Sequence, residues 1–153
     1  MMAYLNVLKS LRHDVDEYHI RVAECTECPL HCVSKRPPYA SFRPVFRGNV
    51  PCDLLLVFPS PRRIDTLAES PLAGLEGDII DEIVNALLSF YPRMRVGLIP
   101  AVHCYPFVAG SGLDEKDYRD PTKHELTVCY NANISRFIEL ANPSIIVLFG
   151  ETL

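Results

Sequence analysis

The sequence lacks the features that place a chain in or across a membrane. No apolar run approaches the roughly 20 residues that a bilayer-spanning helix needs. Residues 1–9 carry apolar side chains at helical spacing, instead of the cationic head and unbroken apolar core of a secretory signal. Internal repeats and low-complexity tracts are also absent. We therefore expect a cytoplasmic protein with no membrane partner, folded as one domain over residues 1–153.

Net positive charge is lacking too. The formal charge is -4, which excludes a global positive field that draws the protein to nucleic acid. Residues 28–52, however, contain no acidic side chain and mix basic with aromatic residues. Such side chains pair with phosphates and stack on bases, but they suit a solvated loop with packing aromatics equally well. The residues are Lys35, Arg36, Arg43 and Arg47, with Tyr39, Phe42 and Phe46.

Apolar periodicity predicts helices and strands in alternation. An N-terminal helix is expected over residues 1–23, a proline-rich segment over 24–52 and an α/β core over 53–153. Thr122 and Glu125 form a capping-box pattern at the start of the last helix. The alternation predicts a three-layer α/β/α fold with a small parallel sheet. Within the core, strands are expected at 53–58, 95–102 and 144–149, and helices at 78–90 and 122–141.

The last predicted strand stands almost at the end of the chain. As the edge of an open sheet, this strand stays exposed unless something covers it. We therefore expect either a C-terminally truncated domain or a partner that supplies the cover. Ligands of such sheets bind beyond the carboxyl ends of the strands, which here are residues 58–63, 103–106 and those from 150 onward.

Cys25 and Cys28 form a Cys-x-x-Cys pair, the strongest chemical signal in the chain. Disulfides are not expected in a reducing compartment. The pair is half of a metal site, a redox pair or a coincidence, and the redox interpretation is the weakest because the pair lies outside a βαβ unit. A four-thiolate centre needs cysteines from elsewhere, and Cys104, after a strand, and Cys129, in a helix, can converge with the pair.

A series of short motifs then runs along the chain. It comprises Cys25-x-x-Cys28-Pro29-Leu30-His31, Gly48-Asn49, Asp53-Leu-Leu-Leu-Val57, Pro71-Leu-Ala-Gly74, Gly77, Ile79-Ile-Asp81-Glu82, Val102-His-Cys104, Arg119-Asp-Pro-Thr122, Glu125, Cys129, and Asn142-Pro143 to Gly150. In this order the series resembles the iron–sulfur, family 4 uracil-DNA glycosylases over roughly residues 25–150. The resemblance implies a uracil-DNA glycosylase-like fold.

The resemblance also implies a cofactor. Cys25, Cys28, Cys104 and Cys129 correspond to the ligands of a [4Fe–4S] cluster, with zinc as the alternative because thiolates bind both. Cys32 and Cys52 are then left as structural residues, and Cys52 suits a buried apolar site.

The substrate pocket of the family is not matched well. Pro59, Ser60 and Pro61 stand in a motif that reads Gly-Glu-Ala-Pro-Gly in the family, so only the proline at 61 is kept. Leu72 replaces the aromatic that stacks on the base, and Pro100 replaces the asparagine that reads uracil. The second catalytic motif, with its histidine, lies beyond the third strand and has no counterpart here.

Two further polar residues border the predicted pocket. Asp65 is either a substitute carboxylate or, more commonly for such a loop residue, half of a surface ion pair. His103 is expected to be a polar strand-end residue rather than a catalytic one.

The resemblance implies base excision from DNA, in repair or replication. The alternative is a catalytically inactive [4Fe–4S] module that binds DNA or has a structural role, and a chain without its catalytic half is a third explanation. Expected partners are DNA and a replication or repair protein. The side chains expected to contact DNA are Arg43, Arg47, Arg62 and Arg63.

Overall fold

Within the described residues, the sheet of this protein has four strands, two of which lie in the centre. The computed structural model describes residues 2–31, 45–108 and 118–150. The strands are β1 (Arg47–Gly48), β2 (Leu54–Phe58), β3 (Val96–Pro100) and β4 (Ile145–Leu148), in the order β1-β3-β2-β4. β2 is parallel to both β3 and β4, as predicted, whereas the two-residue β1 adds an antiparallel edge beside β3.

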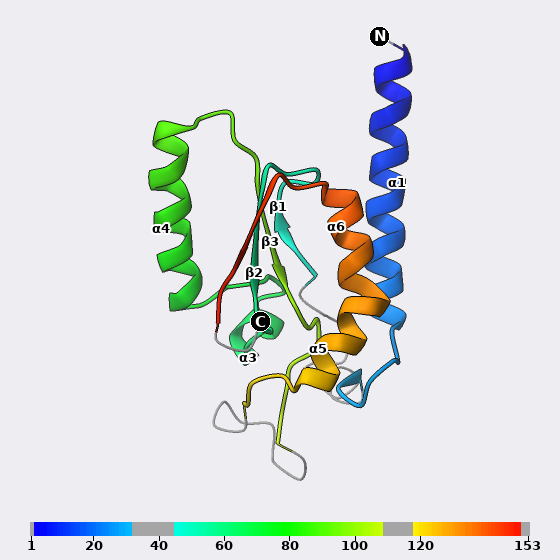
Figure 1. The fold of residues 1–153 in the computed structure, drawn as a ribbon, viewed down its shortest axis with the longest axis vertical. Helices are drawn as coiled ribbons and strands as arrows, with labels where there is room; N and C mark the ends of the chain where they lie inside the picture. Colours follow the sequence, from blue (N-terminus) through cyan, green and yellow to red (C-terminus); the bar gives the residue numbers. More distant parts are fainter. Residues whose placement is uncertain (1, 32–44, 109–117, 151–153) are drawn as a thin grey trace.

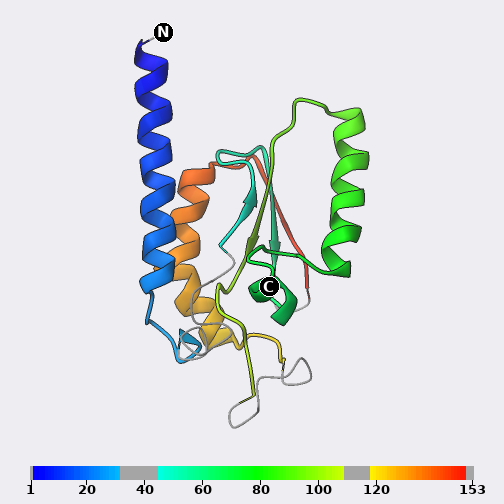
Figure 2. The same ribbon diagram turned by 180° about the vertical axis from the view of Figure 1, so that it is seen from behind.

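Helices cover both faces of the sheet, which confirms the three-layer prediction (Figures 1 and 2). The helix α4 (Leu75–Phe90) lies on one face. The helical segment α5 (Lys123–Cys129), η2 (Tyr130–Ile134) and α6 (Ser135–Ala141) lies on the other, with α1 (Met2–Glu24) packed outside it. A short helix, α3 (Arg63–Leu67), occupies what the sequence suggested was a loop. Among the described helices, none is long and apolar enough to cross a membrane.

The alternation of side chains along β2 creates two apolar cores. Leu55 and Val57 face the helical segment α5–α6 and pack with Tyr18, Val22 and Phe137. The intervening residues of β2 face α4 instead. That second core contains Leu54, Leu56, Phe58, Leu72, Val96 and Leu98, with Ile80 and Val84 of α4 packed against it.

The helical segment α5–η2–α6 is continuous, and η2 is a π-helical turn in its middle. Every fourth residue from Glu125 to Ala141 is buried. In a regular α-helix, each step of four residues advances about 40° beyond one full turn, so such a row drifts away from the core. A π-turn accommodates an extra residue and reduces that drift. The buried row is Glu125, Cys129, Asn133, Phe137 and Ala141.

The edge strand β4 is the least covered element of the sheet. Its residues Ile145 to Leu148 are 38 to 58% exposed, although all four are apolar. On the α4 side, Ile79 and Ile83 are also exposed. The prediction of an exposed last strand is therefore confirmed for the described part of the chain.

Candidate metal centre and adjoining pocket

Four cysteines from three separate parts of the chain line one cavity near the C-terminal end of α1. Cys25 directly follows α1, and Cys28 lies in the turn after it. Cys104 lies in the turn after β3, and Cys129 is the last residue of α5. These are the four thiols that the sequence assigned to a metal. The cavity is lined by Val22, Cys25, Glu27, Cys28, Val102, His103, Cys104, Val128, Cys129 and Asn133.

Cys52 does not belong to this cavity. It is buried at the amino end of β2, beside Gly97, and its backbone N–H donates to the carbonyl of Ala141 over 2.9 Å. Its location agrees with a packing role. Cys32 lies outside the described residues.

Burial makes proton loss difficult at two of the four thiols, Cys28 and Cys129. Burial raises the pKa of the Cys129 thiol to about 12, and the neighbouring Cys104 adds to the increase, whereas a backbone hydrogen bond from His103 opposes it. Burial also raises the pKa of Cys28, with a partial offset from the backbone N–H of Leu30. Because thiols bind metals as thiolates, a cation nearby would favour the deprotonated form of Cys28 and Cys129.

The spacing of the sulfur atoms bears on which metal fits. A single zinc at about 2.3 Å from four thiolates holds the sulfurs about 3.8 Å apart. Among the described residues, no three of the cysteine Sγ atoms lie within 4.8 Å of one another. Thiolates that bind different irons of one cluster are not confined to that tetrahedral spacing. The described thiols are thus not held at the spacing of zinc ligands, and thiolates of this kind serve as ligands of either an iron–sulfur cluster or zinc.

The Arg119-Asp120-Pro121-Thr122 run anchors the helix that carries Cys129. The Arg119 guanidinium donates to both carboxylate oxygens of Glu125, over 2.6 and 2.8 Å. Thr122 and Glu125 form the predicted capping box: the Thr122 N–H donates to Glu125, and the Glu125 N–H donates to Thr122 Oγ1. Arg119 also donates to the Phe107 carbonyl, which follows the β3 end. This motif thus fixes α5 relative to the turn that contains Cys104.

His103 is buried between α1 and the cysteine cavity. Its Nε2 lies 2.8 Å from the Tyr18 hydroxyl. Its backbone N–H points to Cys129, as described above. His103 therefore ties α1 to the turn after β3, in agreement with a structural interpretation of this strand-end residue.

The predicted pocket positions gather where β2 and β3 end. Pro100 pairs with Phe58 in the sheet, and the Val102 N–H donates to the Pro59 carbonyl over 3.2 Å. Ser60 is buried, with its hydroxyl 3.0 Å from that of Tyr118. Pro61 is buried beside it.

Leu72 approaches the same region from the loop before α4. It is buried and adopts a left-handed backbone, with φ of 54°. Its carbonyl packs so closely against Gly77 that a Cβ at position 77 collides with it. Gly77 therefore permits this loop to lie against the first turn of α4.

Asp65 is not a surface residue, and the expectation of a surface ion pair is wrong. Its side chain is 1% exposed and accepts hydrogen bonds from the backbone N–H groups of Arg62 (2.8 Å) and Ala73 (2.7 Å). Burial raises its pKa, and the two backbone hydrogen bonds oppose that shift. Both oxygens thus join the loop after β2 to the loop before α4, and nothing in this geometry indicates a catalytic base.

Two of the four predicted DNA-contacting arginines lie at the carboxyl ends of the strands. The Arg62 guanidinium stacks 4.0 Å from the centre of the Tyr118 ring and donates to Glu76 over 3.1 Å. Arg63 is the first residue of α3.

The other two arginines are not part of that group. Arg47 lies in β1, opposite Leu98 of β3, and donates to Asp81 of α4 over 2.6 Å. Arg43 lies outside the described residues. The structure therefore brings Arg62 and Arg63 together and places Arg47 elsewhere on the sheet.

Sequence reasoning missed two residues of this region. Tyr118 contacts both Ser60 and Arg62, but the sequence around it contains no motif that signals these contacts. Asn133 lies on the wall of the cysteine cavity. Its position four residues after Cys129 places it on the same helical face, which is a signal that the sequence does contain.

Comparison with known proteins defines the class. A sequence profile of the uracil DNA glycosylase superfamily matches residues 46–153, and the chain belongs to this superfamily. It is similar to the type-4 uracil-DNA glycosylase of Thermotoga maritima, with 27% identity over 132 residues, which is 86% of this chain and 59% of that protein. The chain is thus a family 4-like member, and it spans about three fifths of the length of this curated relative.

Proposed function

We propose that this chain is a uracil-DNA glycosylase-like iron–sulfur protein that acts on DNA in repair or replication. The observation that carries the proposal is the convergence of Cys25, Cys28, Cys104 and Cys129 on one cavity. The similarity to a type-4 glycosylase supports the same assignment.

The four thiolates are proposed to hold a [4Fe–4S] cluster, with zinc as the alternative. When bound, the cluster cross-links the chain that follows α1, the turn after β3 and the end of α5. The residues of the chain prepare this site: the Arg119–Glu125 pair fixes α5, and the Tyr18–His103 hydrogen bond fixes the turn after β3. This role is structural, because a cluster in this position holds the layers of the fold together.

DNA is proposed to bind at the carboxyl ends of the strands, where Arg62 and Arg63 lie. Parallel sheets bind ligands at this edge, and arginine side chains contact phosphates. Tyr118 holds the Arg62 guanidinium in a fixed position. Arg43 and Arg47 are proposed as additional contacts.

Excision of a base is the activity that the family suggests for this site. Such enzymes turn the base out of the stack and read its edge with hydrogen bonds. Here, the positions that correspond to the pocket carry Pro59, Leu72 and Pro100, which offer no side-chain donor or acceptor.

Two described polar side chains nearby are engaged, since Ser60 contacts Tyr118 and Asp65 accepts two backbone N–H groups. These contacts favour the second candidate function, a catalytically inactive domain that keeps the metal centre and binds DNA.

Three measurements on the anaerobically purified chain test these proposals. Iron and sulfide analysis should give a four-iron cluster, and a colourless folded protein with one zinc overturns the iron assignment.

Incubation of excess protein with uracil-containing DNA, followed by alkali, decides activity: strand cleavage supports base excision, and intact DNA supports the inactive domain.

DNA affinity tests the interface. Fluorescence anisotropy at increasing salt should show salt-dependent binding, and Arg62→Glu with Arg63→Glu should weaken it about tenfold or more and reduce the salt slope. Arg93→Glu is the matched control, because Arg93 is exposed in the turn between α4 and β3. Equal losses in both proteins contradict an interface at Arg62 and Arg63.

A further inference from the structure

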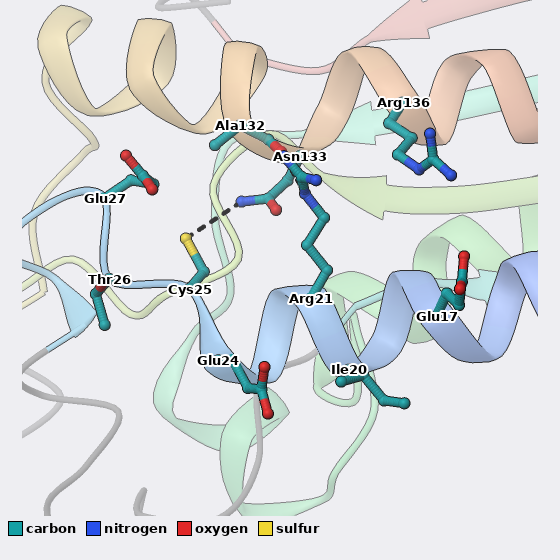
Figure 3. A pocket seen from close by; sticks show the side chains of 10 residues that line it. All are labelled: Glu17, Ile20, Arg21, Glu24, Cys25, Thr26, Glu27, Ala132, Asn133 and Arg136. Atoms are coloured by element: carbon teal, nitrogen blue, oxygen red, sulfur yellow. Dashed lines mark hydrogen bonds between the residues drawn. The ribbon is translucent and has the colours of Figure 1, made fainter.

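Asn133 is a buried amide on the wall between the cysteine cavity and the solvent. It is 2% exposed and belongs to the π-turn η2. It lines the cysteine cavity and also an open hollow between α1 and η2–α6. Figure 3 shows its side chain directed from η2 toward Cys25, with Arg21 and Ala132 beside it. Cys25 is likewise shared by both spaces, so it is the thiol nearest to the open hollow.

The amide nitrogen of Asn133 faces two of the four sulfurs. Its Nδ2 lies 3.5 Å from Cys25 Sγ and 4.0 Å from Cys129 Sγ. Its Oδ1, in contrast, is buried and has no hydrogen-bond partner among the described residues. Buried polar atoms are normally paired, and an exception calls for an explanation. Here the side chain is oriented so that its donors meet the sulfurs while its acceptor stays unsatisfied.

This orientation suits metal-bound sulfur. A thiolate carries no proton, so it only accepts hydrogen bonds, and the N–H groups of an amide are suitable neutral donors. Hydrogen bonds to the sulfurs are among the factors that set the reduction potential of iron–sulfur clusters. They favour the reduced form, because that form carries more negative charge on the sulfurs.

The helix is built to keep Asn133 in this place. Asn133 belongs to the row of buried residues that recurs every four positions, and the π-turn holds this row against the core. Phe137 and Ala141 of this row are apolar, and the charged Glu125 is paired with Arg119, whereas the amide oxygen of Asn133 has no partner among the described residues. The amide at 133 is the member of the row that contacts two cysteines.

We propose that Asn133 is a positioning residue of the metal centre. Its side-chain N–H groups donate to the metal-bound sulfurs of Cys25 and Cys129, hold Cys25 on the solvent-facing side and raise the reduction potential of the cluster. This inference rests on the metal centre proposed above, and it adds a polar contact that controls the stability and the redox behaviour of that centre.

Replacement of the donors with an apolar side chain of similar size tests this role. In Asn133→Leu, the midpoint potential, measured by a redox titration followed by electron paramagnetic resonance, should shift to more negative values. Iron release to the chelator bathophenanthroline should become about tenfold faster, within the range found for residues that support metal ligands. A merely structural residue changes thermal unfolding without a shift of the potential.

Asn131→Leu is the matched control, because Asn131 lies in the same π-turn but is exposed. It should leave both the potential and the iron release at wild-type values. If Asn133→Leu does not fold, Asn133→Ala removes the same donors and suits a helix, and it must show the same shift. A variant that holds iron with the wild-type potential and release rate overturns the inference. Wild-type protein that contains neither iron nor zinc instead overturns the metal centre itself.

Discussion

The cysteine cavity and the carboxyl edge of the sheet lie at the same end of the fold but differ in how their polar groups are used. Around the cavity, hydrogen bonds and ion pairs join separate elements: Arg119 to Glu125, Tyr18 to His103, and Asn133 to Cys25. At the edge, the corresponding positions hold prolines and a leucine, and the adjoining strand β4 is exposed.

The contrast shows which of the two regions is held by polar contacts between separate elements. Polar side chains around the cavity form hydrogen bonds with residues of other elements. The predicted pocket instead contains apolar side chains, and polar side chains whose hydrogen bonds are made within the pocket region. The proposed metal site and the predicted pocket therefore depend on different side chains, so one can change without the other.

The largest expected effect comes from removal of a proposed metal ligand. Cys104→Ser should lose the iron absorbance and lower the free energy of unfolding by roughly 4 kcal/mol or more, since the centre joins three distant segments. Visible absorbance measures the bound iron, and chemical denaturation measures the free energy of unfolding. Cys52→Ser, which changes a buried cysteine outside the cavity, should keep the iron. Loss of iron in both variants contradicts the assignment of four specific ligands.

The edge side can be disturbed without touching the metal site. Gly77→Ala places a Cβ against the Leu72 carbonyl, and we expect a loss of about 2–3 kcal/mol from this overpacking. Gly74→Ala is the control, because its Cβ meets only the movable Ile64 side chain. Both variants should retain iron. Iron loss in Gly77→Ala means that the cysteine cavity and the carboxyl edge of the sheet are coupled, which contradicts their independence.

The Arg119–Glu125 pair makes the cavity side sensitive to acid. Burial acts to raise the pKa of Glu125, but hydrogen bonds from Arg119 and Thr122 outweigh it and hold the pKa below its usual range. The pair therefore stabilises the fold above about pH 4.3, the ordinary value, and this contribution is lost as the pH falls through the lowered pKa.

Glu125→Gln should cost about 2 kcal/mol at pH 7, and the difference from wild type should shrink at acid pH. Denaturation curves from pH 7 to pH 3 measure this. Glu139→Gln, at an exposed position of α6, is the control and should change little. A difference that grows as the pH falls is incompatible with this account.

The smallest effect is expected at the exposed strand. Val147→Thr keeps a β-branched side chain and should change the free energy of unfolding by no more than about 0.5 kcal/mol. Val57→Thr, in the buried strand β2, should cost at least about 1 kcal/mol, because it buries a hydroxyl. Similar losses at both positions indicate that β4 is covered in solution.

The regular elements were accessible from the sequence because they bury apolar stripes of recognisable period. The capping box of Thr122 and Glu125 marked the start of α5 correctly. The two-residue strand β1 and the five-residue helix α3 escaped notice, since elements of this length carry no periodicity. The π-turn was hidden as well, because the choice between α and π hydrogen bonds depends on tertiary packing.

The candidate site was only partly accessible. The Cys25/Cys28 spacing by itself left a metal site, a redox pair and a coincidence open, and the choice of Cys104 and Cys129 over Cys32 and Cys52 came from the family resemblance. One partner of Asp65 could not be predicted, because it is the backbone N–H of Ala73, in a loop eight residues away.

The convergence of the four cysteines has a consequence for synthesis. The Cys25/Cys28 pair leaves the ribosome well before Cys104 and Cys129, and the sheet that brings them together forms only after β3 has been made. During that interval a two-thiolate site is available to any thiophilic ion, and divalent metals differ widely in affinity for such ligands. Loading of the proposed metal centre therefore depends on the order of synthesis, folding and cofactor delivery, as well as on the finished geometry.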